Sequence, residues 1–269
     1  MTTTTQAALP ASRSTHRVTT ARVLRSEWHK LRTLRSTWIT VGSACATVLA
    51  IGILMGATYE TGGGDGDVDT VVLTLIGSQF AQFFLAVLAV LMIAGEYATG
   101  MIRASLSAVP RRLPVLWAKA GVFAAVSFAA MSATALLTFG LTQPLFFQDT
   151  DQAAAFSDPG VARALFGTAA ALTLLGLLAL GLGGVLRSVP GAIGAFICGV
   201  LVLPEVLAML PYDAVETASR YFPPKAAEAL SSAEHLPDAA SPGAALLALT
   251  LWAAASLTAA ALLLRHRDV

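Results

Sequence analysis

Few side chains in this sequence could make or break covalent bonds. Its three lysines precede Leu31, Ala120 and Ala226, whereas the phosphate-binding P-loop has a Ser or Thr directly after its Lys. The four histidines lie in different segments and form no pair at a metal-ligand spacing. No serine occupies the pattern of a nucleophile elbow. We therefore predict no catalytic residue, no metal site and no ATP site within the chain.

Polar side chains inside apolar stretches are the candidates for transport chemistry. Thr74, Ser78 and Gln82 recur every four residues and so share one helix face, with Gln79 beside them. Glu205 follows a proline inside another apolar stretch. Polar groups in hydrocarbon turn toward other helices or a watery cavity. The face therefore either makes helix-to-helix hydrogen bonds or lines a pathway. Glu205 either has a structural place, reaching the outer interface or lying protonated in a packed site, or it is a functional residue of the membrane domain.

The composition indicates a membrane protein. Hydrophobic residues make up 56% of the chain and charged residues only 12%, whereas a soluble domain carries about 25% charged residues. Cys45 and Cys198 lie in apolar runs and supply no disulfide framework.

Six stretches approach or exceed the roughly 20 apolar residues that cross a bilayer as a helix. They are residues 38–58, 71–95, 120–141, 164–186, 191–210 and 243–264. We predict an all-α polytopic protein with a disordered tail over residues 1–20, an interfacial helix over 21–37 and a six-span membrane domain over 38–269.

The basic residues predict the orientation. With the N-terminus inside, fourteen of the 17 Lys and Arg fall on the cytoplasmic side and twelve of the 16 acidic residues on the other side. Lys and Arg are enriched in cytoplasmic loops. Both termini are therefore expected in the cytoplasm.

Residues 21–38 have the pattern of a basic amphipathic helix. One face carries Ala21, Leu24, Trp28, Leu31, Leu34 and Trp38. Another face carries Arg22, Arg25, His29 and Arg32. Such a helix lies in the membrane interface with its cations toward anionic lipid, either as an anchor alone or also packed on a cytoplasmic partner. Glu27 is expected to pair with Lys30, three residues later. Nucleic acid is not an expected partner, because the apolar face would be uncovered in solution.

The loop after the second stretch, EYATGMIRASLSAVPRRLPVLWAK over residues 96–119, resembles the corresponding loop of ABC transporter permeases of the type-2 export family. The residues that carry the resemblance are Glu96, Thr99, Gly100, Leu106, Pro110, Arg111 and Lys119. The segment SEWHKLRT over residues 26–33 resembles the start of such proteins in Gram-positive bacteria, and residues 220–223 resemble their last outer loop. Two departures are Met101, where Thr or Leu is common, and Glu205, which has no family role.

The resemblance implies a coupling helix that docks on a separate ATPase subunit. Its apolar face would comprise Tyr97, Met101, Ile102, Leu106 and Val109. Gly100 would ease the bend and Pro110 would end the helix. Glu96, at the inner mouth, would accept bonds from loop amides or pair with Arg103.

The resemblance further implies a permease of the bacterial cytoplasmic membrane. Two copies, identical or different, would form the pathway, and the ATPase chains would bind ATP and Mg. The sequence indicates no substrate. The alternatives are an ion-coupled secondary transporter using Glu205 and a non-transporting membrane scaffold. A lone membrane carboxylate without an inverted repeat argues against the secondary transporter.

Overall fold

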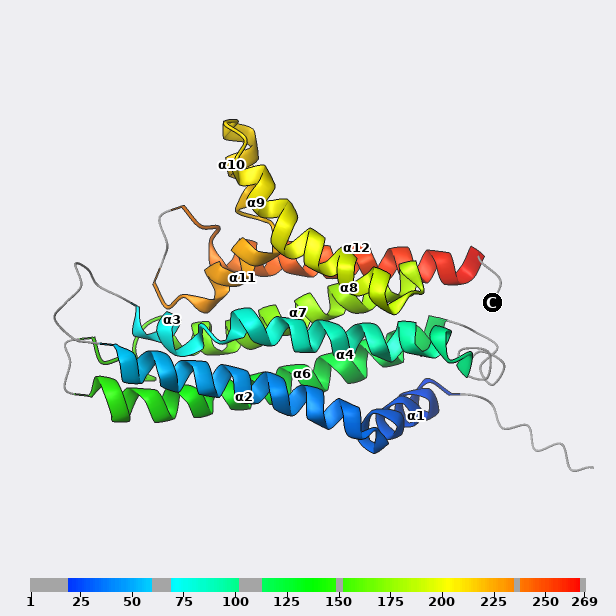
Figure 1. Cartoon of the computed structure of the whole chain (residues 1–269), viewed down its shortest axis with the longest axis horizontal. Coiled ribbons are helices and arrows are strands. Elements are labelled where there is room, and N and C mark those ends of the chain that lie inside the picture. The colour runs from blue at the N-terminus through cyan, green and yellow to red at the C-terminus, as the bar shows by residue number, and fades with distance from the viewer. Residues whose placement is uncertain (1–18, 60–68, 102–112, 149–151, 235–237, 267–269) are drawn as a thin grey trace, which may run out of the picture.

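The computed structural model describes residues 19–59, 69–101, 113–148, 152–234 and 238–266 (Figure 1). These ranges are helical and contain no strand, which confirms the predicted all-α class. Six helical spans are long and apolar enough to cross a membrane, as predicted. They are Arg35–Thr58, Thr70–Ala98, Leu113–Phe147, Val161–Leu186, Val189–Ala208 and Pro242–His266. The predicted tail falls almost entirely outside the described residues, as do residues 102–110 of the predicted coupling helix.

The chain bends sharply between its first two helices. Helix α1 spans Thr20–Thr33, and α2 begins at Arg35 and ends at Thr58. Leu34 between them is extended, with φ −80° and ψ 115°. The interfacial helix is therefore shorter than the predicted 21–37, and Leu34 and Trp38 do not belong to its face.

The second span is divided. Helix α3 spans Thr70–Leu75 and α4 spans Ser78–Ala98, with a tight turn at Ile76 and Gly77. A Cβ added at Gly77 would lie 2.7 Å from Cα of Val48 in α2, so only glycine permits this close approach. Asp69 caps α3 by accepting hydrogen bonds from the backbone N–H groups of the next turn.

Helix α7, Val161–Leu186, lies between its neighbours at the centre of the bundle. It packs against α4, against α6 (Leu113–Thr142) and against α12 (Pro242–His266). Helix α6 continues into the π-helical segment η1, Gln143–Phe147. A Cβ at Gly181 would lie 2.3 Å from Oγ of Ser256 in α12, so the contact between these two helices depends on a residue without a side chain.

A short helix, α11 (Pro223–Ser231), packs against α7 and α12. Its Ala226 and Leu230 are buried. The segment that follows is fixed from two sides, because Asp69 accepts a hydrogen bond from the N–H of Ala233 at 3.0 Å and Arg163 donates to the carbonyl of Ala233 at 2.7 Å.

The fifth span is the least covered. It consists of α8 (Val189–Ile197), η2 (Cys198–Val202) and α9 (Leu203–Ala208), and α10 (Asp213–Ser219) follows. Figure 1 shows α9 and α10 projecting away from the other helices. Pro204 lies in the first turn of α9, directly after the π-helical segment, where its missing N–H is tolerated.

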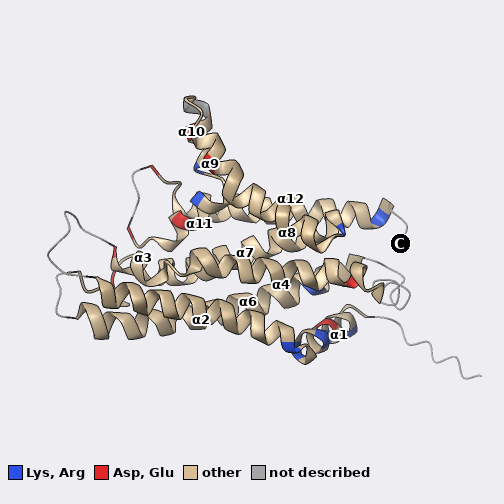
Figure 2. Ribbon diagram, viewed as in Figure 1, with Lys and Arg blue, Asp and Glu red and all other residues tan. Residues whose placement is uncertain are grey.

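Charged side chains are unevenly placed along the bundle. Figure 2 shows Lys and Arg gathered where α1, the start of α6 and the end of α12 lie. We call this the basic end and the opposite end of the bundle the far end. The far end carries Asp69, which caps α3, and Asp158, which lines the same pocket as Asp69.

Candidate functional site

Four charged side chains from three helices meet at the basic end. Glu27 and Lys30 come from α1, Glu96 comes from the last turn of α4, and Lys119 comes from the second turn of α6. We call these four residues the charge cluster. The three-residue spacing of Glu27 and Lys30 places both side chains on one side of α1.

Each ammonium group of the charge cluster bridges both carboxylates. Nζ of Lys119 donates to Oε2 of Glu27 at 2.7 Å and to Oε1 of Glu96 at 2.6 Å. Nζ of Lys30 donates to Oε1 of Glu27 at 2.8 Å and to Oε1 of Glu96 at 3.0 Å. The two positive and two negative groups balance, so the cluster is neutral as a unit.

The cluster is largely shielded from solvent. The exposed fraction is 2% for Lys119, 4% for Glu27 and 8% for Glu96. Buried charges are tolerated when they are paired and hydrogen-bonded. The cluster therefore ties α1, α4 and α6 together, and each member depends on the others.

Lys30 is the more exposed of the two cations, and it lies outside the six spans. Burial acts to lower its pKa, but the hydrogen bonds and negative charges of Glu27 and Glu96 outweigh burial and raise the pKa above its ordinary value of 10.5. Lys30 is therefore charged at neutral pH. Its contribution to stability is complete below pH 10.5 and is lost only as the pH rises through the raised value.

The sequence predicted part of this cluster. The Glu27–Lys30 pair is confirmed. Glu96 lies at the end of the span as predicted, but Lys119 and Lys30 bind it, and Arg103 lies outside the described residues. Lys119 carries part of the family resemblance, yet no pattern in the sequence pointed to its partners. The only sequence feature that singled out Lys119 is that it is one of just three lysines and lies in an apolar run.

An open cavity of about 360 Å³ adjoins the charge cluster, between the α1–α2 bend and the end of α4. We call it the corner cavity. All four cluster residues line it, together with Leu31, Thr33, Leu34, Thr37, Leu91, Met92, Gly95, Thr99 and Met101. Oε2 of Glu96, one of the lining residues, is buried, and no described residue donates a hydrogen bond to it.

The predicted coupling-loop residues separate into two groups. Tyr97 belongs to α4 and packs against the core, with the guanidinium carbon of Arg187 5.0 Å from its ring centre. It therefore does not extend an apolar face of the loop. Gly100 has φ +71° just after α4, as expected of a glycine at the bend. Met101 is 51% exposed, and Ile102, Leu106 and Pro110 lie outside the described residues.

The predicted pathway residues differ in their exposure. Ser78 and Gln82 are buried, whereas Gln79 is exposed. Gln82 donates to the backbone carbonyl of Gln79 at 2.7 Å. Glu205 is exposed on α9, which projects away from the bundle (Figure 1).

One hydrogen bond on this predicted polar face joins two helices. The hydroxyls of Thr74 in α3 and Thr142 in α6 lie 3.0 Å apart. For Thr74, therefore, the structure shows the helix-to-helix alternative.

Helix α1 divides its apolar residues between two surroundings. Leu31 is buried against the bundle, and Val23 packs with Val115 and Ala118 of α6. Leu24 and Trp28 are exposed instead. Leu31 therefore differs from Leu24 and Trp28, with which it was predicted to share a face, because the bundle covers the side of α1 that carries Val23, Glu27 and Leu31.

The exposed side of α1 agrees with an interfacial position. Arg25 and Arg32 are exposed, as predicted for the basic face. Trp28, Trp38 and Trp117 are also exposed at the basic end, and tryptophans with such exposure are enriched at membrane interfaces.

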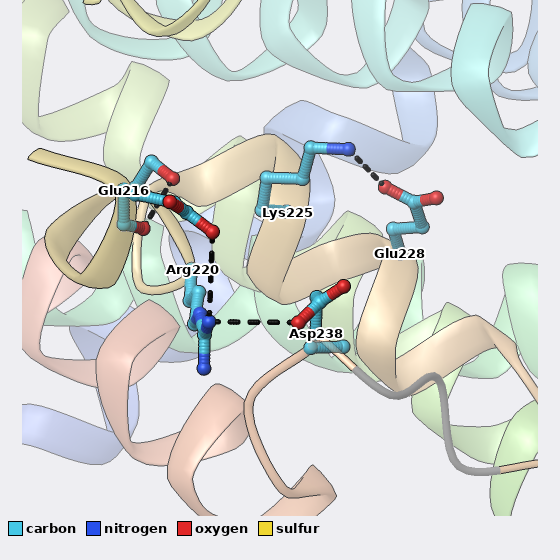
Figure 3. Close-up of a pocket in the computed structure, with 7 residues that line it drawn as sticks. Glu216, Arg220, Lys225, Glu228 and Asp238 are labelled. Carbon is cyan, nitrogen blue, oxygen red and sulfur yellow. Dashed lines mark hydrogen bonds and ion pairs between the residues drawn. The ribbon is translucent and has the colours of Figure 1, made fainter. Parts of the chain in front are cut away.

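A second group of charges lines a pocket at the far end (Figure 3). Arg220 lies 3.8 Å from Glu216 and 3.6 Å from Asp238, and Lys225 lies 3.0 Å from Glu228. These side chains remain substantially exposed, and exposed ion pairs contribute only about 0–1 kcal/mol. The charge cluster at the basic end is therefore the stronger candidate.

Comparison with known proteins gives no relative from which a role could be transferred. No family model, curated protein or solved structure matches the chain. In the part of the chain that the structure describes, no group of three or more His, Cys, Asp or Glu could hold a metal ion. The candidate site therefore rests on its own geometry.

Proposed function

We propose that this chain is the membrane permease subunit of an ATP-driven exporter of the ABC type. Two copies form the pathway, and separate ATPase chains bind ATP and Mg. The observation that carries the proposal is the 2.6 Å contact between Lys119 and Glu96. This ion pair joins the two helices that flank residues 99–112. Those residues lie within the segment 96–119, whose sequence resembles the ATPase-docking loop of the type-2 export permeases.

The charge distribution supports a cytoplasmic position for the basic end. The sequence assigns fourteen of the 17 Lys and Arg to the segments predicted to be cytoplasmic, in accord with the positive-inside rule. The loop and both termini then face the compartment that holds ATP.

The charge cluster gives docking a mechanical consequence. A displacement of the loop moves the ends of α4 and α6, which the bond between Glu96 and Lys119 holds together. The bond between Lys119 and Glu27 transmits the movement to α1. Closure of the ATPase chains therefore moves three helices together. This movement changes the pathway from inward-facing to outward-facing.

The second copy covers the poorly packed fifth span. Glu205 on α9 is exposed in a single chain, and Val206 and Met209 beside it are 52% and 81% exposed. A carboxylate facing hydrocarbon is costly. A second permease copy on this surface removes Glu205 from lipid.

Cysteine labelling tests the docking loop. In a chain with Cys45 and Cys198 changed to Ala, we expect Met101→Cys to react with a membrane-impermeant maleimide from the cytoplasmic side, because Met101 is half exposed. Bound ATPase should slow this reaction at least tenfold. Phe156→Cys, exposed at the far end, is the control and should be unaffected by the ATPase. Equal rates for Met101→Cys with and without the ATPase would reject docking at this loop.

The exposure of Glu205 also favours a second candidate, an ion-coupled transporter. Glu205→Gln keeps the size of the side chain and removes its charge. We expect ATP-driven export in proteoliposomes to persist in this variant, within about twofold of the wild-type rate. Loss of transport at normal expression, together with transport by the wild-type chain on a proton gradient without ATPase, would instead support the ion-coupled function.

A further inference from the structure

We propose that the corner cavity binds a phospholipid whose headgroup ends in a primary ammonium, as in phosphatidylethanolamine. The proposal requires only that the chain spans a membrane with α1 at its surface. It does not depend on the exporter function.

The cavity lining changes from polar to apolar with depth. Thr33 and Thr99 lie at its polar end, and Leu91 and Met92 lie toward the middle of the span. Thr99 and Leu91 are eight residues apart, which corresponds to about 12 Å along α4. A phospholipid changes from headgroup to acyl chain over a similar distance. Leu91 is also 42% exposed, so the apolar end of the cavity opens toward lipid.

The carboxylate of Glu96 provides one half of the headgroup recognition. Its Oε1 accepts bonds from both lysines of the charge cluster, whereas its Oε2 accepts none from the described residues. A buried acceptor without a donor is unfavourable. A primary ammonium carries three N–H donors and can supply one. A trimethylammonium group carries none.

Lys30 provides the other half. Its side chain lines the cavity and is 32% exposed, in contrast to 3% for Lys119. An ammonium near the cavity opening is suited to a phosphate oxygen. A headgroup with one negative and one positive group therefore meets a cation at Lys30 and a carboxylate at Glu96.

Two other ligand types fit less well. An anionic lipid without an ammonium adds a net negative charge to the charge cluster, which is neutral as a unit, and supplies no ammonium donor for Oε2 of Glu96. A soluble amine leaves the surface formed by Leu34, Leu91 and Met92 uncovered. The zwitterionic lipid matches both the charges and the apolar end.

Lipid retention by the purified full-length protein tests the proposal. The protein is equilibrated in detergent with equal amounts of phosphatidylethanolamine, phosphatidylcholine and phosphatidylglycerol with identical acyl chains, and retained lipid is measured by native mass spectrometry. We expect at least a fivefold preference for phosphatidylethanolamine over phosphatidylcholine. An excess of soluble glycerophosphoethanolamine should not displace the bound lipid.

Gly95 is a position from which a larger side chain can enter the cavity. It lines the cavity, and a Cβ added there meets no atom within 4 Å. Gly95→Leu should therefore reduce retained phosphatidylethanolamine at least tenfold while the protein remains folded. Gly140→Leu is the matched control. A Cβ added at Gly140 also meets no atom within 4 Å, and Gly140 lies near the C-terminal end of α6, whereas the cavity adjoins the N-terminal end of that helix. This variant should retain lipid like the wild type.

Glu96→Gln supplies a second variant, in which the preference for phosphatidylethanolamine over phosphatidylcholine should disappear. Because Glu96→Gln also alters the charge cluster, the lipid retention of Gly95→Leu is the result that accepts or rejects the proposal. Equal retention of the two lipids by the wild type, selective retention of phosphatidylglycerol, or unchanged retention in Gly95→Leu would each overturn the proposal. Displacement by soluble glycerophosphoethanolamine would show that the headgroup suffices and would overturn the lipid assignment. ATPase binding is measured separately, and its failure would reject the proposed exporter function without affecting the lipid proposal.

Discussion

Lys119→Met is expected to destabilise the protein by about 3–5 kcal/mol, because it leaves Glu27 and Glu96 buried with one cation fewer. Methionine preserves most of the side-chain volume, so the effect reports the lost charge rather than a cavity. The measurement is thermal unfolding in detergent. A change of this size lowers the Tm by roughly 6–20 °C for a chain of this length.

Lys225→Met is the matched control for Lys119→Met. Lys225 also contacts a glutamate, Glu228, at 3.0 Å, but its side chain is 59% exposed. Its loss should cost less than about 1 kcal/mol. Adding Glu27→Gln to Lys119→Met should restore part of the lost stability, because it removes one unbalanced charge. Equal Tm values for Lys119→Met and Lys225→Met would show that the charge cluster does not hold the three helices together.

Met101→Asp is expected to weaken binding of the ATPase subunit by about 2 kcal/mol, roughly 30-fold, if Met101 is an anchor of the docking surface. ATP hydrolysis stimulated by the permease should fall in parallel. Unfolding should not change, because Met101 is half exposed and lies after the last turn of α4. Binding is measured by co-purification and by titration of the ATPase onto permease in nanodiscs.

Met101→Leu serves as the conservative control for Met101→Asp. Leucine retains the apolar surface and should bind the ATPase within about twofold of the wild type. If the aspartate variant bound as tightly as the leucine variant, Met101 would not be part of the docking surface. Loss of binding in both variants would indicate that the backbone at this position, and not the apolar surface, is sensitive.

The spans were predictable because hydropathy reports burial in lipid directly. The predicted stretch 164–186 corresponds to Val161–Leu186, and 243–264 corresponds to Pro242–His266. The errors arose at the ends. Helix α4 continues to Ala98, beyond the predicted end at residue 95, and this last turn places Tyr97 beside Arg187 instead of in the loop.

The charge cluster was only partly predictable because its contacts are distant in sequence. Glu27 and Lys30 lie three residues apart, so helical spacing sufficed to pair them. Lys119 lies 92 residues beyond Glu27, and no spacing rule connects them. The helical wheel of α1 did not predict the burial of Leu31, for a related reason. It separates apolar from charged residues, whereas the bundle covers a side of α1 that contains both Leu31 and Glu27.

The sequence separation within the charge cluster also imposes an order on biosynthesis. Glu27 and Lys30 leave the ribosome long before Lys119, which follows Glu96 by 23 residues. Until the third span is made, the nascent chain has two carboxylates and one ammonium at this junction. The contacts that hold α1 against α6 are therefore completed late, and a chain truncated before residue 119 retains one carboxylate more than its ammonium group can balance.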